Sequence, residues 1–241
     1  MRQSYIDVQH VTRAFVTAEG RRLALDDVSL SVAEGECVVI GGENGSGKSL
    51  LMAIIAGLER PDSGAVSCAA RVGLVFQEAD TQILGETPRE DIAFGPKNQK
   101  KPEAEIAAAV ERALRQTGLQ AKADYPARFL SGGEKRRLAV ACMLAMDLPA
   151  IIFDEPYANL DYGGVRQVNW LLRRLREEGR TVLILTHELE KCLGMADRLI
   201  VLFRGRKVFD GSPEDGLRQN LARWNIRNPL AAYSSVKDLI W

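Results

Sequence analysis

A glycine-rich octapeptide, Gly42-Glu43-Asn44-Gly45-Ser46-Gly47-Lys48-Ser49, carries the clearest chemical signal in the sequence. It fits the pattern GxxxxGK[ST], in which the backbone folds around phosphate oxygens and points its N–H groups at them. Lys48 would reach the β- and γ-phosphates of a nucleotide, and the Ser49 hydroxyl would bind Mg²⁺. We count Leu50, in the helix expected to begin near Lys48, among the binding residues because the helix dipole favours anions there. The octapeptide therefore predicts a site for ATP and Mg²⁺; a chance glycine turn is the alternative.

Two carboxylates follow a later apolar run, Ile151-Ile152-Phe153. If this run is a parallel strand, Asp154 and Glu155 lie at its carboxyl end, where such sheets bind their ligands. Asp154 would hold Mg²⁺ directly or through water, and Glu155 would polarise the attacking water as a general base. The alternative is a solvated strand end that carries two acids.

A second possible anion site is the segment Leu130-Ser131-Gly132-Gly133-Glu134, which precedes an expected helix. Ser131, Gly132 and Gly133 would then lie at a helix N-terminus, where backbone N–H groups are free to bind an anion. A plain Ser-Gly-Gly helix cap is the alternative. One nucleotide does not need two such sites from one chain, so this segment calls for a further explanation.

Short strands and helices alternate along most of the chain, which is typical of a parallel α/β sheet. The alternation of Val28, Leu30 and Val32 with small polar residues predicts a half-buried strand, and the run Cys37–Ile40 predicts a strand buried on both faces. The other expected strands are Val72–Phe76, Ile151–Phe153, Val182–Leu185 and a hairpin of Leu199–Phe203 and Lys207–Phe209, and a turn is expected at Pro61–Gly64. The expected helices are Leu50–Leu58, Pro102–Gln116, Glu134–Met146, Val165–Glu178, Glu188–Met195 and Pro213–Trp224.

The bulk composition is that of a globular protein. The chain has 241 residues, 46% of them hydrophobic, and Lys plus Arg balance Asp plus Glu at 32 each. A nucleic-acid binder usually carries a basic excess, so we expect no nucleic-acid partner. The four widely spaced cysteines favour neither a disulfide framework nor a metal site. No signal peptide or run long enough to span a bilayer is visible, so any membrane role would come through a partner.

The segment 130–134 resembles the LSGGQ signature of ABC-type ATPases, with Glu134 in place of the usual Gln. Further motifs of that family occur on both sides of this segment, in the family's order along the chain. Gln77 matches the Q-loop, which senses Mg²⁺ and the lytic water; Asp161, in Asn159-Leu160-Asp161, matches the D-loop; and His187 matches the switch histidine that contacts the γ-phosphate. Phe15 falls near the aromatic residue that stacks on adenine, and a core phenylalanine is its alternative reading.

Membership of this family would explain the second anion site. The resemblance implies that Ser131, Gly132, Gly133 and Asp161 of one chain complete the site of a second ATPase subunit in a head-to-tail dimer. It implies one nucleotide-binding domain over residues 1–241, with a P-loop NTPase core, an N-terminal antiparallel β subdomain and a helical subdomain inserted at about 86–147. The tail 223–241 matches no motif.

Residues 75–83, 90–98 (EDIAFGPKN) and 131–141 look like those of energy-coupling-factor transporter ATPases. That branch implies a second ATPase subunit (an identical or a related chain), a transmembrane coupling protein and a substrate-capturing membrane protein, with this chain peripheral at the cytoplasmic face of the membrane. Ile83, Leu84, Ile92 and Phe94 would either contact the coupling protein or pack the helical lobe. The alternatives are a conventional ABC importer or exporter ATPase, a soluble ABC ATPase, and a nucleotide-dependent module without hydrolysis.

Overall fold

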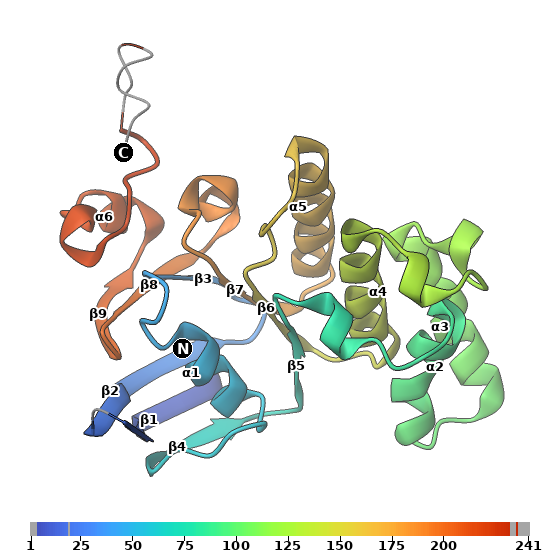
Figure 1. Ribbon diagram of the computed structural model, residues 1–241, viewed down its shortest axis with the longest axis horizontal. Helices are drawn as coiled ribbons and strands as arrows, with labels where there is room; N and C mark the ends of the chain where they lie inside the picture. Colours follow the sequence, from blue (N-terminus) through green and yellow to red (C-terminus); the bar gives the residue numbers. More distant parts are fainter. Residues whose placement is uncertain (1–3, 19, 232–234, 236–241) are drawn as a thin grey trace.

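The computed structural model describes residues 4–18, 20–231 and 235 (Figure 1). The strands are β1 (Ser4–Thr17), β2 (Gly20–Ala33), β3 (Cys37–Gly41), β4 (Ser63–Cys68), β5 (Val72–Val75), β6 (Ala150–Asp154), β7 (Thr181–Leu185), β8 (Arg198–Phe203) and β9 (Arg206–Gly211). The α-helices are α1 (Lys48–Ile55), α2 (Pro88–Asn98), α3 (Glu103–Thr117), α4 (Gly132–Ala145), α5 (Tyr162–Glu177) and α6 (Pro213–Leu217). Short 3₁₀ turns cover Ala79–Gln82, Gln120–Lys122, Ala127–Phe129, Leu189–Lys191, Leu193–Met195 and Leu221–Trp224.

The described strands form two sheets. One has six strands in the order β5-β6-β7-β3-β8-β9, all neighbours parallel except the hairpin β8–β9. The other has three antiparallel strands in the order β2-β1-β4. These sheets confirm the predicted fold class, a parallel α/β core with an antiparallel N-terminal part.

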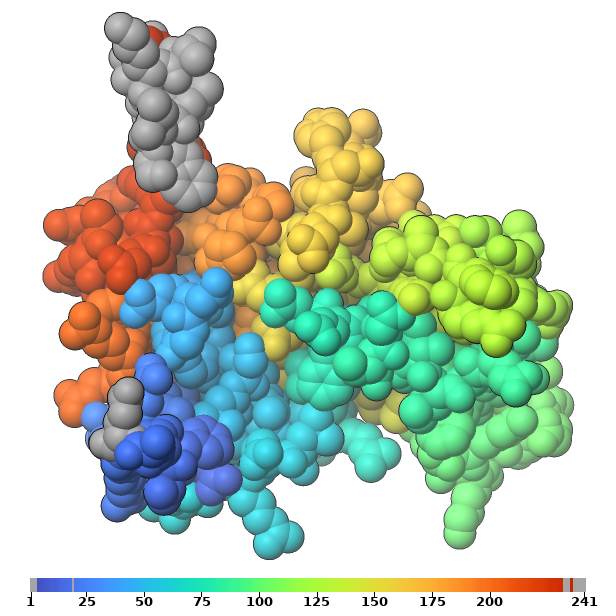
Figure 2. All heavy atoms as spheres, in the orientation of Figure 1, coloured from blue at the N-terminus to red at the C-terminus, as the bar shows by residue number. Residues whose placement is uncertain are grey.

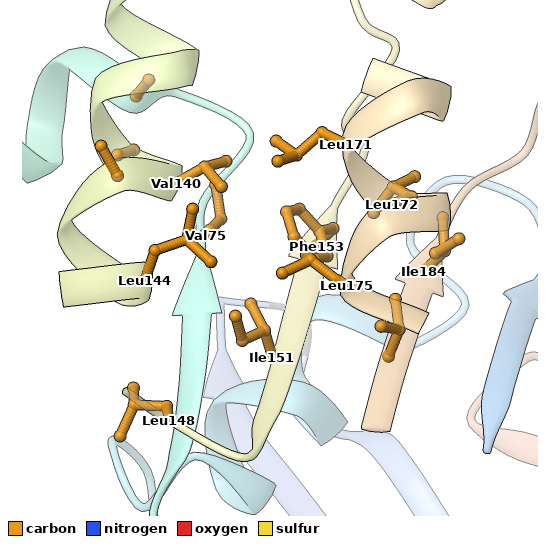
Figure 3. Packing of buried hydrophobic residues seen from close by; sticks show 14 of the residues in the cluster. Val75, Val140, Leu144, Leu148, Ile151, Phe153, Leu171, Leu172, Leu175 and Ile184 are labelled. Atoms are coloured by element: carbon orange, nitrogen blue, oxygen red, sulfur yellow. The ribbon is translucent and has the colours of Figure 1, made fainter. Parts of the chain in front are cut away.

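The parallel strands of the six-stranded sheet are buried on both faces, because their alternate residues belong to two different hydrophobic clusters. Val39 of β3, Phe153 of β6 and Ile184 of β7 face one cluster, whereas Ile40 and Ile152 face the other. Figure 3 shows the first cluster, in which residues of α4 and α5 approach β6 from either side. The second cluster joins the sheet to α1 and to the antiparallel strands.

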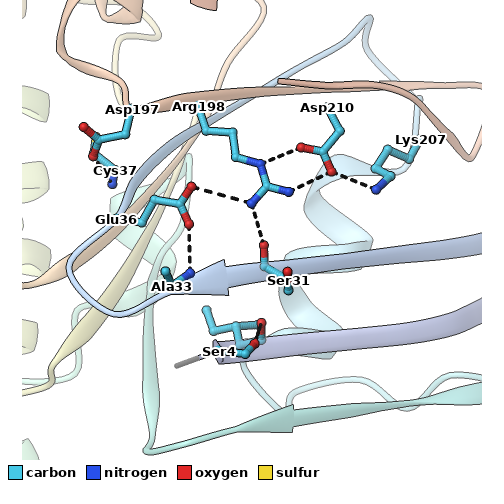
Figure 4. Close-up of polar contacts among 10 residues, drawn as sticks. Ser4, Ser31, Ala33, Glu36, Cys37, Asp197, Arg198, Lys207 and Asp210 are labelled. Atoms are coloured by element: carbon cyan, nitrogen blue, oxygen red, sulfur yellow. Dashed lines mark hydrogen bonds and ion pairs between the residues drawn. The ribbon is translucent and has the colours of Figure 1, made fainter. Parts of the chain in front are cut away.

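A polar network centred on Arg198 of β8 joins the two sheets (Figure 4). The Arg198 guanidinium binds both carboxylate oxygens of Asp210, at 2.5 and 2.8 Å, and donates at 2.9 Å to the carbonyl of Ser31 in β2. Lys207 adds a hydrogen bond of 2.7 Å to Asp210. The antiparallel sheet is therefore fixed to β8 and β9 by hydrogen bonds as well as by apolar packing.

Helices α2, α3 and α4 form a group beyond the β5 edge of the main sheet (Figure 1). This group lies within the predicted helical subdomain, whose bounds at 86–147 stay a prediction. The sequence analysis missed α2, although Thr87 caps it by accepting from the Glu90 backbone N–H and Pro88 occupies its first turn. A capping residue followed by proline is a helix-start signal, but Pro96 inside the helix obscured it.

Three smaller expectations were wrong. Ser63 and Gly64 belong to β4 rather than to a turn, and β4 was missed because its residues are largely exposed and show no apolar alternation. The expected helix Glu188–Met195 consists of two 3₁₀ turns, interrupted at Cys192, where φ is −140°. The expected helix Pro213–Trp224 stops at Leu217, and a separate turn begins at Leu221.

The predicted tail at 223–241 lies only partly within the described residues. Trp224 and Ile226 are buried in the larger cluster, so the tail begins as part of the core. Residues 232–234 and 236–241, which include the Tyr233 and Trp241 noted in the sequence, lie outside the described residues.

Candidate nucleotide site

The glycine-rich loop lies between the end of β3 and the start of α1 at Lys48, as predicted. Gly42 has a φ of +149°, and a Cβ there would lie 2.3 Å from the Leu202 carbonyl oxygen. Gly47 has a φ of +100°, and a Cβ there would lie 2.7 Å from the Ala24 carbonyl oxygen of β2. Both positions therefore require glycine for the backbone conformation and for the close approach of a neighbouring strand.

Lys48 points back into the loop. Its side chain is 5% exposed, and its Nζ donates to the carbonyl oxygens of Gly42 at 2.7 Å and Glu43 at 2.9 Å. Burial lowers the pKa of the Lys48 ammonium, and the nearby carboxylates of Glu155, Asp154 and Glu43 act in the opposite direction. The loop thus surrounds a nearly buried cation.

Asp154, Glu155 and His187 meet at the carboxyl ends of β6 and β7. The two strands are neighbours, with Asp154 opposite Leu185, and the Glu155 N–H donates to the Leu185 carbonyl at 2.9 Å. His187 follows β7 by two residues, and its Nδ1 lies 3.0 Å from Glu155 Oε1. Glu155 has a positive φ of 46°, a strained conformation for a non-glycine residue.

Three buried oxygens at this site have no hydrogen-bond partner among the described residues: Ser46 Oγ, Asp154 Oδ1 and Glu155 Oε2. Burial raises the pKa of the Asp154 carboxyl, and a hydrogen bond from Ser49 lowers it. Buried polar atoms normally have partners, so these three oxygens are candidates for contacts with a ligand. Hydroxyl and carboxylate oxygens are what Mg²⁺ binds, and it also takes nucleotide phosphates and waters as ligands. The donor set therefore fits Mg²⁺ although the described residues hold no cluster of three or more His, Cys, Asp or Glu.

Gln77 lies just beyond β5, exposed, in a segment fixed by two residues that the sequence analysis missed. Gln82 closes the segment, since its amide accepts from the Phe76 N–H and donates to the Leu74 carbonyl, both at 2.8 Å. Arg136 of α4 donates to the carbonyls of Gln77 at 3.2 Å, Pro156 at 3.1 Å and Ala158 at 2.9 Å. One guanidinium thus connects α4, the Gln77 segment and the segment after Glu155.

Ser131, Gly132 and Gly133 start α4, away from the glycine-rich loop. Ser131 forms a capping box with Glu134, in which the Glu134 carboxylate accepts from the Ser131 N–H at 2.8 Å. Hydrogen bonds from Lys122 and from the Ser131 backbone lower the pKa of Glu134 to about 2. The helix cap considered in the sequence analysis is therefore present, with Gly132 and Gly133 in the first turn behind it. Asp161 is the N-cap of α5, and its side chain accepts from the Gly164 N–H at 2.7 Å.

The remaining predicted nucleotide-binding residues include Phe15, Leu50 and Glu43. Phe15 is exposed on β1, opposite Arg22, and the Arg13 guanidinium lies 5.1 Å from its ring centroid, so it is not the core residue of the alternative reading. Leu50 packs against the cluster beneath α1. Glu43 accepts a hydrogen bond of 2.6 Å from Asn225, a contact between the loop and the start of the tail that no sequence pattern indicated. Asn44 and Gly45 of the loop are both exposed.

The comparisons with known proteins agree with this geometry. The family model described as "ABC transporter" matches residues 25–158, more than half of the chain. The chain belongs to the ABC transporter family. The energy-coupling factor transporter ATP-binding protein EcfA2 of Methanospirillum hungatei is 36% identical over 224 residues, which is 86% of this ABC chain and 56% of that relative. The chain therefore spans about half the length of that curated relative.

Two solved ABC structures superimpose on the chain over most of its length. One is cbiO1 from Clostridium perfringens, part of the ABC transporter complex cbiONQ, with a TM-score of 0.80, 30% identity and coverage of 95% of this chain and 97% of that one. The other is the dimeric post-hydrolysis state of the ATP-binding cassette MJ0796 with ADP and Pi, with a TM-score of 0.78, 28% identity and coverage of 86% and 98%. Among the described residues of this ABC chain, no helix has both the length and the apolar character needed to cross a bilayer.

Proposed function

We propose that this chain is the ATP-binding subunit of a membrane uptake complex of the energy-coupling-factor type, and that it hydrolyses ATP at the interface of an ATPase dimer. The observation that carries the proposal is the meeting of Lys48, Asp154, Glu155 and His187 at the glycine-rich loop, with three buried oxygens left without partners. The similarity to EcfA2 and cbiO1 supports the branch of the family.

Each residue at the loop has a proposed task. The backbone of residues 42–49 and the Lys48 ammonium bind the β- and γ-phosphates, and Phe15 stacks on the adenine. Glu155 accepts a proton from the attacking water, and His187, hydrogen-bonded to Glu155, contacts the γ-phosphate.

Mg²⁺ is part of the proposal because the oxygens present fit it. Ser49, Asp154 and Gln77 would hold the ion, which neutralises charge on the phosphates when bound. Asp154 is the central member of this set, since its buried Oδ1 lacks a partner and its carboxyl already accepts from the Ser49 hydroxyl.

The second half of each site is proposed to come from another ATPase subunit, either an identical chain or a related one. Among the described residues, no hydrogen bond or ion pair joins Ser131–Gly133 to the glycine-rich loop. Ser131 is the N-cap of α4, with Gly132 and Gly133 in the first turn, and Asp161 is the N-cap of α5. Helix N-termini attract anions. The dimeric form of the MJ0796 cassette, with ADP and Pi bound, supports this arrangement.

The transmembrane coupling protein is proposed to dock near the Gln77 segment, and a substrate-capturing membrane protein completes the complex. Leu84 is 68% exposed and Phe94 is 48% exposed, so these two residues offer an apolar contact surface. Ile92 is fully buried and packs the helical group, as the alternative reading held for it. We place the chain peripherally at the cytoplasmic face of the membrane, with no nucleic-acid partner.

Two substitutions test the catalytic proposal. Glu155→Gln removes the general base, so steady-state ATP turnover should fall by about 10²- to 10⁴-fold while an ATP-bound dimer accumulates in size-exclusion chromatography. The control is Glu190→Gln, an exposed acid three residues past His187, which should keep full turnover. Full turnover in Glu155→Gln would show that Glu155 is not the base.

Ser131→Arg tests the site shared between chains. It should abolish turnover and leave nucleotide binding by the monomer unchanged, measured by equilibrium fluorescence with a labelled ATP analogue. Ser212→Arg is the matched control, because Ser212 caps α6 in the same manner but lies at no proposed site. Loss of monomer binding in Ser131→Arg alone would contradict a site completed by a second chain.

A further inference from the structure

A cavity of about 580 Å³ lies between α4 and α5, apart from the glycine-rich loop. Its apolar wall includes Val140 of α4, Phe153 of β6 and Leu171 of α5, which face one another across the gap in Figure 3. The surface is notched between α5 and the helical group in Figure 2. The volume is in the range of pockets that enclose a small organic molecule.

The rim of this cavity is strongly basic. Arg115 of α3, Arg136 and Arg137 of α4, and Arg166 of α5 line it, and none of the described lining residues is an Asp or Glu. This concentration of four positive charges stands out in a chain whose formal net charge is zero. Two acids lie just behind this lining, since Asp161 accepts from Gly164 and Glu178 accepts from Gln116. The lining itself carries only positive charge, which raises the local concentration of anions.

Two of the arginines are already engaged and two are available. Arg136 donates to three carbonyls, and Arg137 donates to Gln167 at 2.8 Å. Arg115 and Arg166 are exposed and make no hydrogen bond or ion pair with the other described residues; Arg166 has only the Tyr162 ring 6.0 Å away. They belong to two different helices that line the cavity, α3 and α5, so each offers a guanidinium to an anionic group.

We propose that this cavity is a binding site for a small amphipathic organic anion, a carboxylate or phosphate ester on an apolar body. The apolar body would fill the space over Val140, Phe153 and Leu171, and the anionic group would pair with Arg115 and Arg166. The half-exposed Trp170, at the rim, would cover part of the apolar body. An uncharged molecule would leave the arginines unpaired, and a cation would be repelled.

The position of the cavity gives the ligand a route to regulation. Gly133 and Leu160 line it, and they adjoin Ser131 and Asp161 of the proposed two-chain ATP site. An occupant would contact both segments at once and would change ATP turnover. This regulatory step rests on the proposed function, whereas binding to the cavity does not.

Decanoate is the test probe, with decyl phosphate as the second anion, and decan-1-ol and decyltrimethylammonium as the uncharged and cationic counterparts. Calorimetric titration without nucleotide should show one saturable site for each anion and none for the counterparts.

Arg115→Gln/Arg166→Gln should weaken decanoate binding at least about tenfold. Arg112→Gln/Arg173→Gln removes the same charges from exposed positions on the same two helices, outside the cavity, and should leave affinity unchanged. Decanoate should also alter Trp170 fluorescence, a signal that Trp170→Phe removes.

Three results would overturn the site: no saturable binding of either anion, equal binding of decan-1-ol, or equal weakening in the two double variants. Tighter binding of one anion would identify the headgroup as carboxylate or phosphate.

The regulatory step is tested by turnover. Saturating decanoate should change the ATP turnover of the wild-type chain at least about twofold and leave the turnover of Arg115→Gln/Arg166→Gln unchanged. Binding without any change in turnover would refute the regulatory step alone, and an inactive wild-type chain that still binds decanoate would count against the proposed function instead.

Discussion

Replacing Arg136 with Met tests whether one guanidinium holds the nucleotide site to the helical group. Met keeps much of the apolar stem of the side chain but removes the donors to the carbonyls of Gln77, Pro156 and Ala158. A hydrogen bond to a charged group contributes about 1.5–3 kcal/mol. The net effect is smaller than three such bonds, because burial lowers the pKa of Arg136, which shows that its charge is partly desolvated. We therefore expect a loss of about 2 kcal/mol in the free energy of unfolding.

In a chain of this size, that loss lowers the melting temperature by about 4–8 °C, which calorimetry can measure. Because Pro156 and Ala158 lie one and three residues after Glu155, we also expect ATP turnover to fall about tenfold with monomer nucleotide affinity unchanged. Arg137→Met is the control for stability, since Arg137 makes one exposed hydrogen bond to Gln167 and its loss should cost less than about 1 kcal/mol. Equal melting temperatures for both variants would refute the reasoning, and so would full turnover in Arg136→Met.

Three further substitutions give separable outcomes. Lys48→Ala should abolish nucleotide binding, measured by fluorescence titration, because it removes the cation inside the loop; unchanged turnover would exclude the phosphate-binding role. Gly42→Ala should also abolish binding, because its Cβ would lie 2.3 Å from a carbonyl oxygen, whereas Gly179→Ala, with a positive φ but open space, should bind normally. Glu134→Ala should cost about 1 kcal/mol of stability at neutral pH through the lost capping box. The folded pKa of Glu134 is lowered from 4.5 to about 2, so its contribution is present above pH 4.5 and is lost as pH falls toward 2. Denaturant unfolding at descending pH should show the two chains converging, and a constant difference would contradict the assignment.

Local sequence patterns were sufficient where the structure depends on neighbours along the chain. The glycine-rich loop requires glycine at positions 42 and 47 for its local backbone geometry. In the sequence this requirement is visible as the fixed glycine spacing of the GxxxxGK[ST] pattern. The buried strands β3, β6 and β7 were recognisable as continuous apolar runs, because a strand covered on both faces has no polar side. The roles of Ser131, Gln77, Asp161 and His187 came from a family resemblance and stay predictions.

Tertiary structure decided whatever depends on residues far apart in sequence. The sequence by itself indicated a phosphate-binding loop, two carboxylates at a strand end and an α/β sheet to hold them. Only the fold showed that Arg136 reaches carbonyls 20 and 59 residues away, that Ile92 is buried whereas Leu84 and Phe94 are exposed, and that Arg115 and Arg166 line one cavity. A side chain's partners across such separations are fixed by how helices pack on the sheet, and no spacing within one element records that packing.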